Sequence, residues 1–181
     1  MKKLRGSKMI HINLKTCSST QTYLKELVEK DPSSINKNIL VTTLMQTDGI
    51  GRSSNHWHYF KDAIAFSCII PAVGNKTMIP LKIGILLSNF FEQKYQKKIY
   101  LKWPNDLMTQ TRLKVGGVIA NLQGNHILLG IGINLFKSDT EAKMPFKYDG
   151  LFEQEKRFNI EELSKEIYQF LLENISKTLS P

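Results

Sequence analysis

The stretch over residues 100–117, YLKWPNDLMTQTRLKVGG, constrains the fold of this chain more than any other. Its first residues favour a β-strand, and Pro104 must end that strand because proline has no backbone N–H to donate. A second strand is predicted over residues 113–122, so the two extended segments are expected to lie side by side. The pattern therefore brings Asp106, at the exit of the first strand, close to Lys114, at the start of the second.

A plain β-hairpin, with a turn aspartate and a solvent-exposed lysine, explains the same pattern. For an arbitrary Asp/Lys pair that explanation is the more common one. Gly116 and Gly117 add a further feature, because paired glycines remove side chains where a ligand could approach the backbone. Both interpretations of this stretch remain open at the level of residue pattern.

The rest of the chain alternates short predicted strands with three helices. Strands are predicted over residues 9–14, 38–46, 63–71 and 126–135, the last joined to residues 113–122 through a turn at Gln123-Gly124-Asn125. Helices are predicted over residues 21–30, 80–96 and 160–172. Because the strands come in adjacent runs rather than in strict βαβ alternation, the pattern indicates an α+β fold with a mixed, mainly antiparallel sheet.

The ends of two helices carry capping residues. Ser19 or Thr20 is a natural N-cap for the first helix, and Asn159 caps the last one with Glu162 at the capping-box position. The central helix, 80–96, is apolar around most of its axis, so Ile85 is expected to be buried.

Length and composition describe an ordinary globular domain. The 181 residues are enough for one domain with a real core, predicted to span residues 1–181, and no apolar run reaches membrane length. The first residues lack a hydrophobic signal core, so a cytoplasmic protein is expected. Cys17 and Cys68 are far apart without CxxC spacing, which predicts reduced, structural thiols.

The formal net charge of +9 indicates anionic partners. Such a balance suits nucleic acid, anionic substrates or an acidic protein surface, although many of the lysines would simply be solvated. No helix-turn-helix, RNP or zinc-finger pattern is present in the sequence. The four histidines show no metal-ligand spacing.

The run Lys-Trp-Pro-Asn-Asp at 102–106, followed by Lys114 and the Gly-Gly pair, closely resembles the biotin protein ligase family, also called biotin–[acetyl-CoA-carboxylase] ligases. Ser19-Thr20 resembles the start of the Ser-Thr-Asn segment of that family. The loop after residue 46 resembles its Gly-Arg-Gly-Arg-x-x-Gly-x-x-Trp loop, which folds over biotinyl-adenylate. Three departures are visible: Gln21 stands for Asn, Ile50 for the first Arg, and Ser54 for the last Gly.

The resemblance implies a set of site residues. The catalytic ones would be Lys114, Arg52 and Asp106. Biotin-binding residues would be Ser19, Thr20, Gln21, Gln46, Gly49, Ile50, Gly51, Arg52, Lys114, Gly117, Gly130 and Gly132. ATP and adenylate would be bound by Arg52, Trp57, Lys102, Asn105 and Asn134. Ligands for a metal ion are not assigned.

The implied chemistry is transfer at phosphorus without a protein nucleophile, and no Ser-His-Asp or Cys-His arrangement is evident. Lys114 would lie between the biotin carboxylate and the α-phosphate, and Arg52 would clamp the phosphate. Asp106 would either orient and deprotonate the acceptor lysine or help to hold Mg²⁺. The glycine-rich loop over residues 47–57 would be flexible and close over the adenylate.

The resemblance also implies a fold, substrates and partners. The fold would be that shared with class II aminoacyl-tRNA synthetases, with helices packed against the sheet. Biotin and ATP with Mg²⁺ would be the substrates, and the biotin carboxyl carrier protein of acetyl-CoA carboxylase the acceptor, with a homodimer left open and neither DNA nor a membrane as a partner. An N-terminal DNA-binding domain and a C-terminal β-barrel, present in relatives, are expected to be absent.

Two alternatives remain at this level. A lipoate or octanoate ligase or transferase has a related fold, although its Arg-Arg-x-x-Gly-Gly-Gly segment is not found in this sequence. A basic RNA-binding domain would explain the charge but not the Lys-Trp-Pro-Asn-Asp run.

Overall fold

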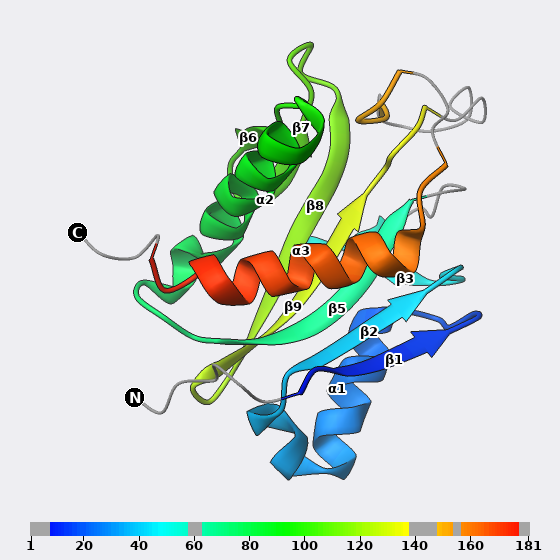
Figure 1. Cartoon of the computed structure of the whole chain (residues 1–181). Helices are drawn as coiled ribbons and strands as arrows, with labels where there is room; N and C mark the ends of the chain where they lie inside the picture. Colours follow the sequence, from blue (N-terminus) through cyan, green and yellow to red (C-terminus); the bar gives the residue numbers. More distant parts are fainter. Residues whose placement is uncertain (1–7, 58–62, 138–147, 154–156, 178–181) are drawn as a thin grey trace.

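A computed structural model describes residues 8–57, 63–137, 148–153 and 157–177 of the chain. Its main sheet contains β1 (Ile10–Leu14), β2 (Ile39–Thr43), β5 (Ile64–Pro71), β6 (Tyr100–Lys102), β7 (Asp106–Met108), β8 (Lys114–Gln123) and β9 (His126–Ile133). The strand order is β1-β2-β5-β9-β8-β7-β6 (Figure 1). Strands β1 and β2 run parallel, and every other neighbouring pair in this sheet is antiparallel. The predicted α+β class with a mixed, mainly antiparallel sheet is confirmed.

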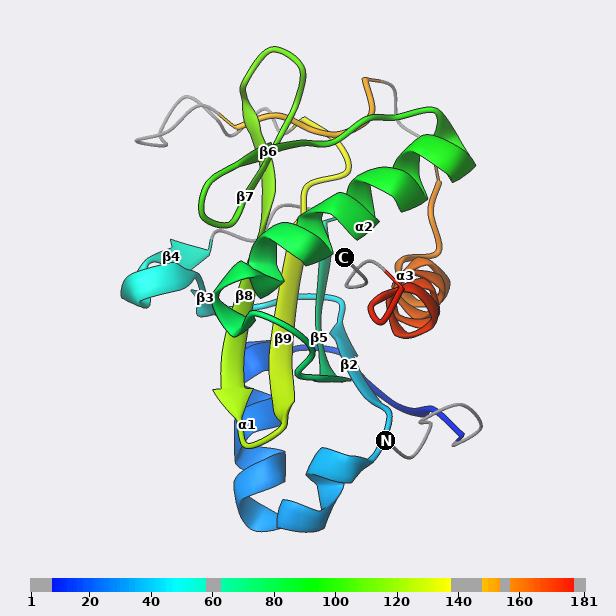
Figure 2. The same cartoon turned by 90° about the vertical axis from the view of Figure 1, so that its left-hand side faces the viewer.

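Helices cover both faces of the sheet. The helices α2 (Ile79–Tyr95) and α3 (Ile160–Asn174) lie on one face, and α1 (Thr20–Lys30) lies on the other (Figure 2). Because side chains alternate along a strand, β5 places Phe66 and Cys68 in the larger core under α2 and α3, and Ile69 in the smaller core under α1. The short 3₁₀ segments are η1 (Pro32–Asn36), η2 (Arg52–Ser54) and η3 (Lys76–Met78).

Strands β8 and β9 form an antiparallel hairpin, which confirms the sequence prediction. Its register pairs Gly117 with Gly132 and Gln123 with His126. The two residues between the strands form the turn, and Gly124 has a φ of 58° there. A left-handed backbone of this kind favours glycine because no Cβ collides with the carbonyl oxygen.

The predicted caps are confirmed, and one predicted core residue is wrong. The Ser19 side chain accepts hydrogen bonds from backbone N–H groups of α1, and the Asn159 side chain accepts one from Glu162 N. Ile85 is 40% exposed rather than buried. Helix α2 packs through one side only, against the sheet and α3, so its outer side faces solvent even where the residue is apolar.

The segment over residues 47–57, which was predicted as a loop, contains two short strands and a 3₁₀ turn. Strands β3 (Gly49–Ile50) and β4 (His56–Trp57) pair antiparallel as a separate small sheet, with η2 between them. Two-residue strands are too short to leave an alternating pattern in a sequence, so residue pattern alone indicated only a loop. We call this segment the β3–β4 hairpin below.

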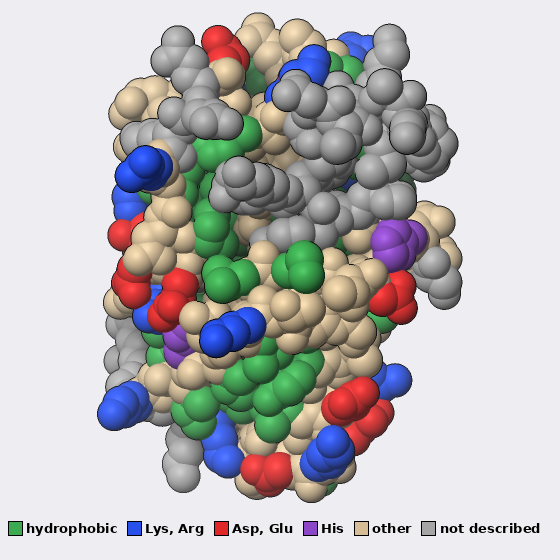
Figure 3. Space-filling model, turned by 90° about the vertical axis from the view of Figure 1, so that its right-hand side faces the viewer, with side chains coloured by type: hydrophobic (Ala, Val, Ile, Leu, Met, Phe, Trp, Pro, Cys, Tyr) green, Lys and Arg blue, Asp and Glu red, His purple; other side chains and the backbone are tan. Residues whose placement is uncertain are grey.

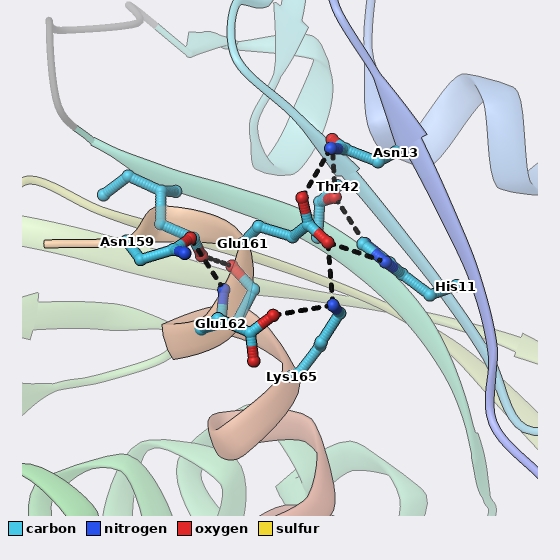
Figure 4. A network of polar contacts seen from close by, with 9 residues as sticks. His11, Asn13, Thr42, Asn159, Glu161, Glu162 and Lys165 are labelled. Atoms are coloured by element: carbon cyan, nitrogen blue, oxygen red, sulfur yellow. Dashed lines mark hydrogen bonds and ion pairs between the residues drawn. The ribbon is translucent and has the colours of Figure 1, made fainter.

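A polar network fixes the start of α3 against the edge strand β1 (Figure 4). Asn13 Nδ2 donates to Glu161 Oε2 over 2.8 Å, and His11 Nδ1 lies 3.4 Å from Glu161 Oε1. Lys165 Nζ donates to Glu161 Oε1 over 2.7 Å. Burial lowers the pKa of His11, against the opposing effect of Glu161.

The segment predicted to be irregular, 137–158, lies largely outside the described residues. Its described part runs beside the end of β9, where Leu151 N donates to Asn134 O and Phe152 N donates to Leu135 O. This short strap closes one end of the sheet.

The surface away from the sheet centre is partly apolar. Leu44 and Met45, directly after β2, are 60% and 48% exposed. On the face seen from the right of Figure 1, hydrophobic side chains gather with charged ones around them (Figure 3). None of the helices in the described ranges is both long and apolar enough to span a membrane.

Candidate functional site

A cavity of about 760 Å³ lies on the α1 face of the sheet, between the start of α1, the β3–β4 hairpin and strands β7, β8 and β9. Most of the predicted site residues line it: Ser19, Thr20, Gln21, Gln46, Ile50, Gly51, Arg52, Trp57, Lys102, Asn105, Asp106, Lys114, Gly117, Gly130 and Gly132. These residues are spread over more than a hundred positions of the sequence. The fold therefore brings together the residues that the resemblance singled out.

Gly49 and Asn134, also predicted as site residues, do not line the cavity. A Cβ added at Gly49 would lie 2.6 Å from the carbonyl oxygen of Trp57, so glycine permits the close approach of β3 and β4. Asn134 is 2% exposed, and its N–H donates to Val115 O over 2.7 Å. Gly49 therefore acts through its neighbour Trp57, which does line the cavity, and Asn134 Oδ1 is buried without a hydrogen-bond partner among the described residues.

The floor of the cavity is a row of cross-strand neighbours. In the sheet, Lys102 pairs with Asp106, Asp106 with Gly117, and Gly117 with Gly132. Paired residues on adjacent strands point to the same face. The two glycines form one end of this row, and the charged side chains stand at the other end.

Lys114 reaches this face because the register shifts between β7 and β8. Leu107 pairs with Gly116, but Met108 pairs with Lys114, so Val115 is the extra residue. A regular ladder would pair Met108 with Val115 and turn Lys114 toward the core, since a shift of one residue exchanges the faces. With the bulge, Lys114 Nζ lies 2.6 Å from Asp106 Oδ1, and Val115 is buried.

The inner end of the cavity is uncharged and polar. The backbone N–H of Thr20 donates to Gln46 Oε1 over 2.8 Å, which fixes the orientation of that amide because an N–H can only donate. The Thr20 hydroxyl lies 3.2 Å from Gln46 Oε1 and 3.0 Å from Ser67 Oγ. Gln46 Nε2 makes no hydrogen bond within the described ranges, so it is available to donate to a ligand.

Gln21 adds an acceptor at the same end. Its Nε2 donates to Leu128 O over 2.9 Å and to Asn121 Oδ1 over 3.1 Å. A carbonyl can only accept, so the amide orientation is fixed and Oε1 is the free atom. Gln21 Oε1 is buried without a hydrogen-bond partner among the described residues, which is costly unless a ligand donates to it.

Gly130 and Gly132 leave space for these groups. A Cβ at Gly130 would lie 2.8 Å from Gln21 Oε1, and one at Gly132 would lie 2.6 Å from Trp57 Cζ2. The Trp57 ring therefore rests directly on the backbone of β9. Its Nε1 is buried and has no acceptor within the part of the chain described.

The outer end of the cavity is cationic. Arg52, Lys102, Arg112 and Lys114 line it, and Asp106 is the single carboxylate among the described lining residues. Lys114 is paired with Asp106, whereas the other three cations have no hydrogen-bond or ion-pair partner in the described ranges. Anions are therefore the favoured ligands of this end.

The residues that were not found from the sequence include three polar lining residues, Ser67, Arg112 and Tyr148, and a partner of Gln21, Asn121. Ser67 and Asn121 lie in ordinary strand patterns, and only the structure shows that Ser67 lines the cavity and that Asn121 accepts a hydrogen bond from Gln21. Tyr148 lies beside Lys114 through an isolated bridge. Burial, and then the negative charge of Asp106, raises the pKa of the Tyr148 hydroxyl, which keeps it neutral and able to donate.

A dedicated metal site is not formed by the residues whose structure is described, because no three of their His, Cys, Asp and Glu side chains cluster. The cavity offers one carboxylate, Asp106. That donor set fits a Mg²⁺ ion that is held mainly by phosphate oxygens and water, since Mg²⁺ in nucleotide sites often takes only one or two protein carboxylates.

Comparison with known proteins gives a family and a set of similar structures. The profile of the Biotin/lipoate A/B protein ligase family matches residues 14–135. The Aquifex aeolicus biotin protein ligase in complex with biotin and ATP is 28% identical with a TM-score of 0.71, covering 93% of this chain and 69% of that one.

Two further structures share the fold at lower identity. The biotin acetyl coenzyme A carboxylase synthetase from Helicobacter pylori, with bound biotinylated ATP, is 24% identical with a TM-score of 0.71 over 92% of this chain and 75% of that one. The P. falciparum LipL1 in complex with lipoate is 9% identical with a TM-score of 0.61 over 92% and 63%. The fold is thus common to biotin-binding and lipoate-binding proteins.

Proposed function

The chain belongs to the Biotin/lipoate A/B protein ligase family, and from that membership we propose that it is a biotin ligase. It would activate biotin with ATP as biotinyl-5'-AMP and then transfer the biotinyl group to a lysine of a biotin carboxyl carrier protein. Biotin, lipoate and octanoate differ at one end and share a carboxylate at the other. The inner end of the cavity is therefore where the choice of substrate is made.

The hydrogen-bonding groups at the inner end of the cavity favour biotin over lipoate and octanoate as the substrate. Gln46 Nε2 offers a donor, and Gln21 Oε1 offers a buried acceptor that lacks a partner among the described residues. The cyclic urea of biotin presents both a carbonyl oxygen and N–H groups, so it would satisfy both. The dithiolane ring of lipoate and the alkyl chain of octanoate offer no such donor, which would leave Gln21 Oε1 unpaired at a cost of about 1–3 kcal/mol.

The cationic outer end suits the first chemical step. A biotin carboxylate oxygen attacks the α-phosphorus of ATP, the bond from that phosphorus to the β-bridging oxygen breaks, and pyrophosphate leaves. Two anions must approach each other, so catalysis depends on positioning and charge neutralisation. Lys114 would lie between the carboxylate and the α-phosphate, and Arg52 would hold the phosphate from the β3–β4 hairpin. Bound Mg²⁺, with Asp106 as its protein ligand, would further neutralise phosphate charge.

The second step uses the same end of the cavity. The amine of the acceptor lysine attacks the carbonyl carbon of biotinyl-AMP, an amide forms, and AMP leaves with the bonding electrons. The attacking amine must lose a proton, and the Asp106 carboxylate is the acidic group of the lining that could orient it and accept that proton. The Trp57 ring and the β3–β4 hairpin would cover the mixed anhydride and limit its hydrolysis.

A direct test compares biotin, lipoate and octanoate in acid-dependent ATP–pyrophosphate exchange. Biotin should support exchange at far lower concentration than the other two acids. Gln21→Met, which removes the amide at similar size, should weaken biotin about tenfold or more while changing lipoate little. Gln93→Met, at an exposed glutamine of α2, is the matched control. Exchange that prefers lipoate or octanoate would overturn the assignment of biotin.

A further inference from the structure

Arg112 occupies an unusual position in the turn between β7 and β8. Its backbone φ is 61°, in the left-handed region that non-glycine residues seldom adopt. Its side chain lines the cavity beside Lys114. Arg112 thus places a long cationic side chain at the outer end of the site, although its left-handed backbone conformation disfavours arginine.

Hydrogen bonds from Thr109 hold this turn in place. Thr109 N donates to Leu113 O over 2.8 Å, and Arg112 N donates to Thr109 O over 3.1 Å. Leu113 N in turn donates to Thr109 Oγ1 over 3.1 Å. The conformation of Arg112 is therefore determined by its surroundings, and it persists although glycine or asparagine would adopt it more readily.

Arg112 is the cation of the cavity lining to which the proposed function has not yet given an anionic partner. Under the proposed function, Arg52 and Lys114 act on the carboxylate and α-phosphate, and Lys102 on the adenylate. The side chain of Arg112 has no hydrogen-bond or ion-pair partner within the described ranges. The anion still to be accommodated is the terminal diphosphate of ATP, which carries most of the negative charge of the nucleotide.

We infer that Arg112 binds the β- and γ-phosphates of ATP and then the pyrophosphate that they become. This rests on the proposed function, because this chain releases pyrophosphate only if it adenylates its substrate acid. A guanidinium binds two phosphate oxygens at once through its paired N–H groups, and it stays charged throughout. Arg112 is exposed, so it holds the leaving group at the solvent end of the cavity.

The reverse reaction isolates this contribution. A pyrophosphate oxygen attacks the α-phosphorus of the acyl-adenylate, the bond from that phosphorus to the acyl oxygen breaks, and ATP and the free carboxylate result. Pyrophosphate must bind for this step and is absent from the second half-reaction, in which the acceptor lysine attacks biotinyl-AMP. A residue specific for pyrophosphate therefore affects one half-reaction and not the other.

Arg112→Asn and Arg112→Gly test the inference, because both residues suit the left-handed backbone and neither carries a charge. The melting temperature should be unchanged or slightly higher. The KM for pyrophosphate in biotin-dependent exchange should rise about 10–100-fold, the loss expected for hydrogen bonds to a charged group. Transfer from preformed biotinyl-AMP to a biotin carrier domain should change less than about twofold. Lys30→Asn, at the far end of α1, is the control for net charge.

Two results would overturn the inference. One is an unchanged KM for pyrophosphate in folded Arg112→Asn. The other is a raised KM for the carrier domain with pyrophosphate unaffected, which would place Arg112 in acceptor docking. Calorimetric titration with inorganic pyrophosphate gives a readout that does not depend on turnover. If the wild-type protein shows no exchange with biotin, lipoate or octanoate, the proposed function fails. If wild-type protein and Arg112→Asn then also bind inorganic pyrophosphate with equal affinity in calorimetry, the role of Arg112 is refuted as well.

Discussion

Replacement of Lys114 by methionine separates a catalytic lysine from a solvated one. The Nζ atom of Lys114 lies 2.6 Å from Asp106 Oδ1, and the two side chains are 29% and 22% exposed. Methionine keeps much of the length of the side chain and removes its charge. If Lys114 lies between two anions during adenylation, its loss should affect the reaction far more than the stability of the fold.

The magnitudes can be estimated from that geometry. A partly exposed ion pair of this kind contributes about 0–1 kcal/mol to the free energy of unfolding. Loss of one preorganised group that stabilises developing charge typically lowers the rate about 10²–10³-fold, or roughly 2.7–4 kcal/mol. Asp106 would also be left next to the substrates without its lysine partner, so the measured loss of rate includes the effect of an uncompensated carboxylate.

The assay is the rate of biotinyl-AMP formation in a single turnover, measured together with urea unfolding of each variant. Lys98→Met, at an exposed lysine just before β6, serves as the control. We expect a large loss of rate in Lys114→Met with less than about 1 kcal/mol of lost stability. Near-normal adenylate formation by the folded variant would refute the reasoning and leave Lys114 as a surface partner of Asp106.

Three further predictions concern other parts of the structure. Ile50 lines the cavity and is 43% exposed, so Ile50→Arg can place a cation near the ligand anions without burying it. Calorimetry should show about tenfold tighter binding of biotinyl-AMP to this variant. Equal or weaker binding would mean that isoleucine fills an apolar niche. Gly130→Val should fill the space beside Gln21 Oε1 and weaken biotin binding about tenfold or more by calorimetry, whereas unchanged affinity would place the biotin ring elsewhere. Burial lowers the pKa of His11 in the folded protein, so the unfolded chain binds a proton at this side chain more tightly. The contribution of neutral His11 to the free energy of unfolding is therefore present above about pH 6.5, and it is lost as the pH falls through the lower pKa of the folded state. Urea unfolding should show this loss in the wild-type protein and not in His11→Gln; parallel pH profiles would contradict it.

Features set by neighbouring residues were predictable from the sequence. The hairpin of β8 and β9 follows from two apolar runs joined by Gly124, and the capping of α3 by Asn159 follows from one short polar side chain before an amphipathic segment. The proximity of Asp106 and Lys114 was predicted, but the pairing behind that prediction was wrong. The strand that ends before Pro104, β6, does not lie beside β8, because the three-residue strand β7, which carries Asp106, lies between them.

Features that depend on register or on distant partners were not predictable. The bulge that turns Lys114 toward Asp106 moves the register by one residue, and local pattern does not show such a shift. The orientations of the Gln21 and Gln46 amides are fixed by Leu128 O and Thr20 N, which come from other elements of the fold. Ile85 looked buried because its neighbours are apolar, yet only one side of α2 has anything to pack against.

Mass spectrometry of the acceptor detects whether the protein transfers biotin to a carrier lysine. The protein is incubated with Mg-ATP, a biotin carrier domain and an equal mixture of biotin, lipoate and octanoate. We expect the carrier to gain one biotinyl group on one lysine, with no modification when that lysine is replaced by methionine. A carrier that gains a lipoyl or octanoyl group instead, or that stays unmodified in the presence of folded protein, would contradict it.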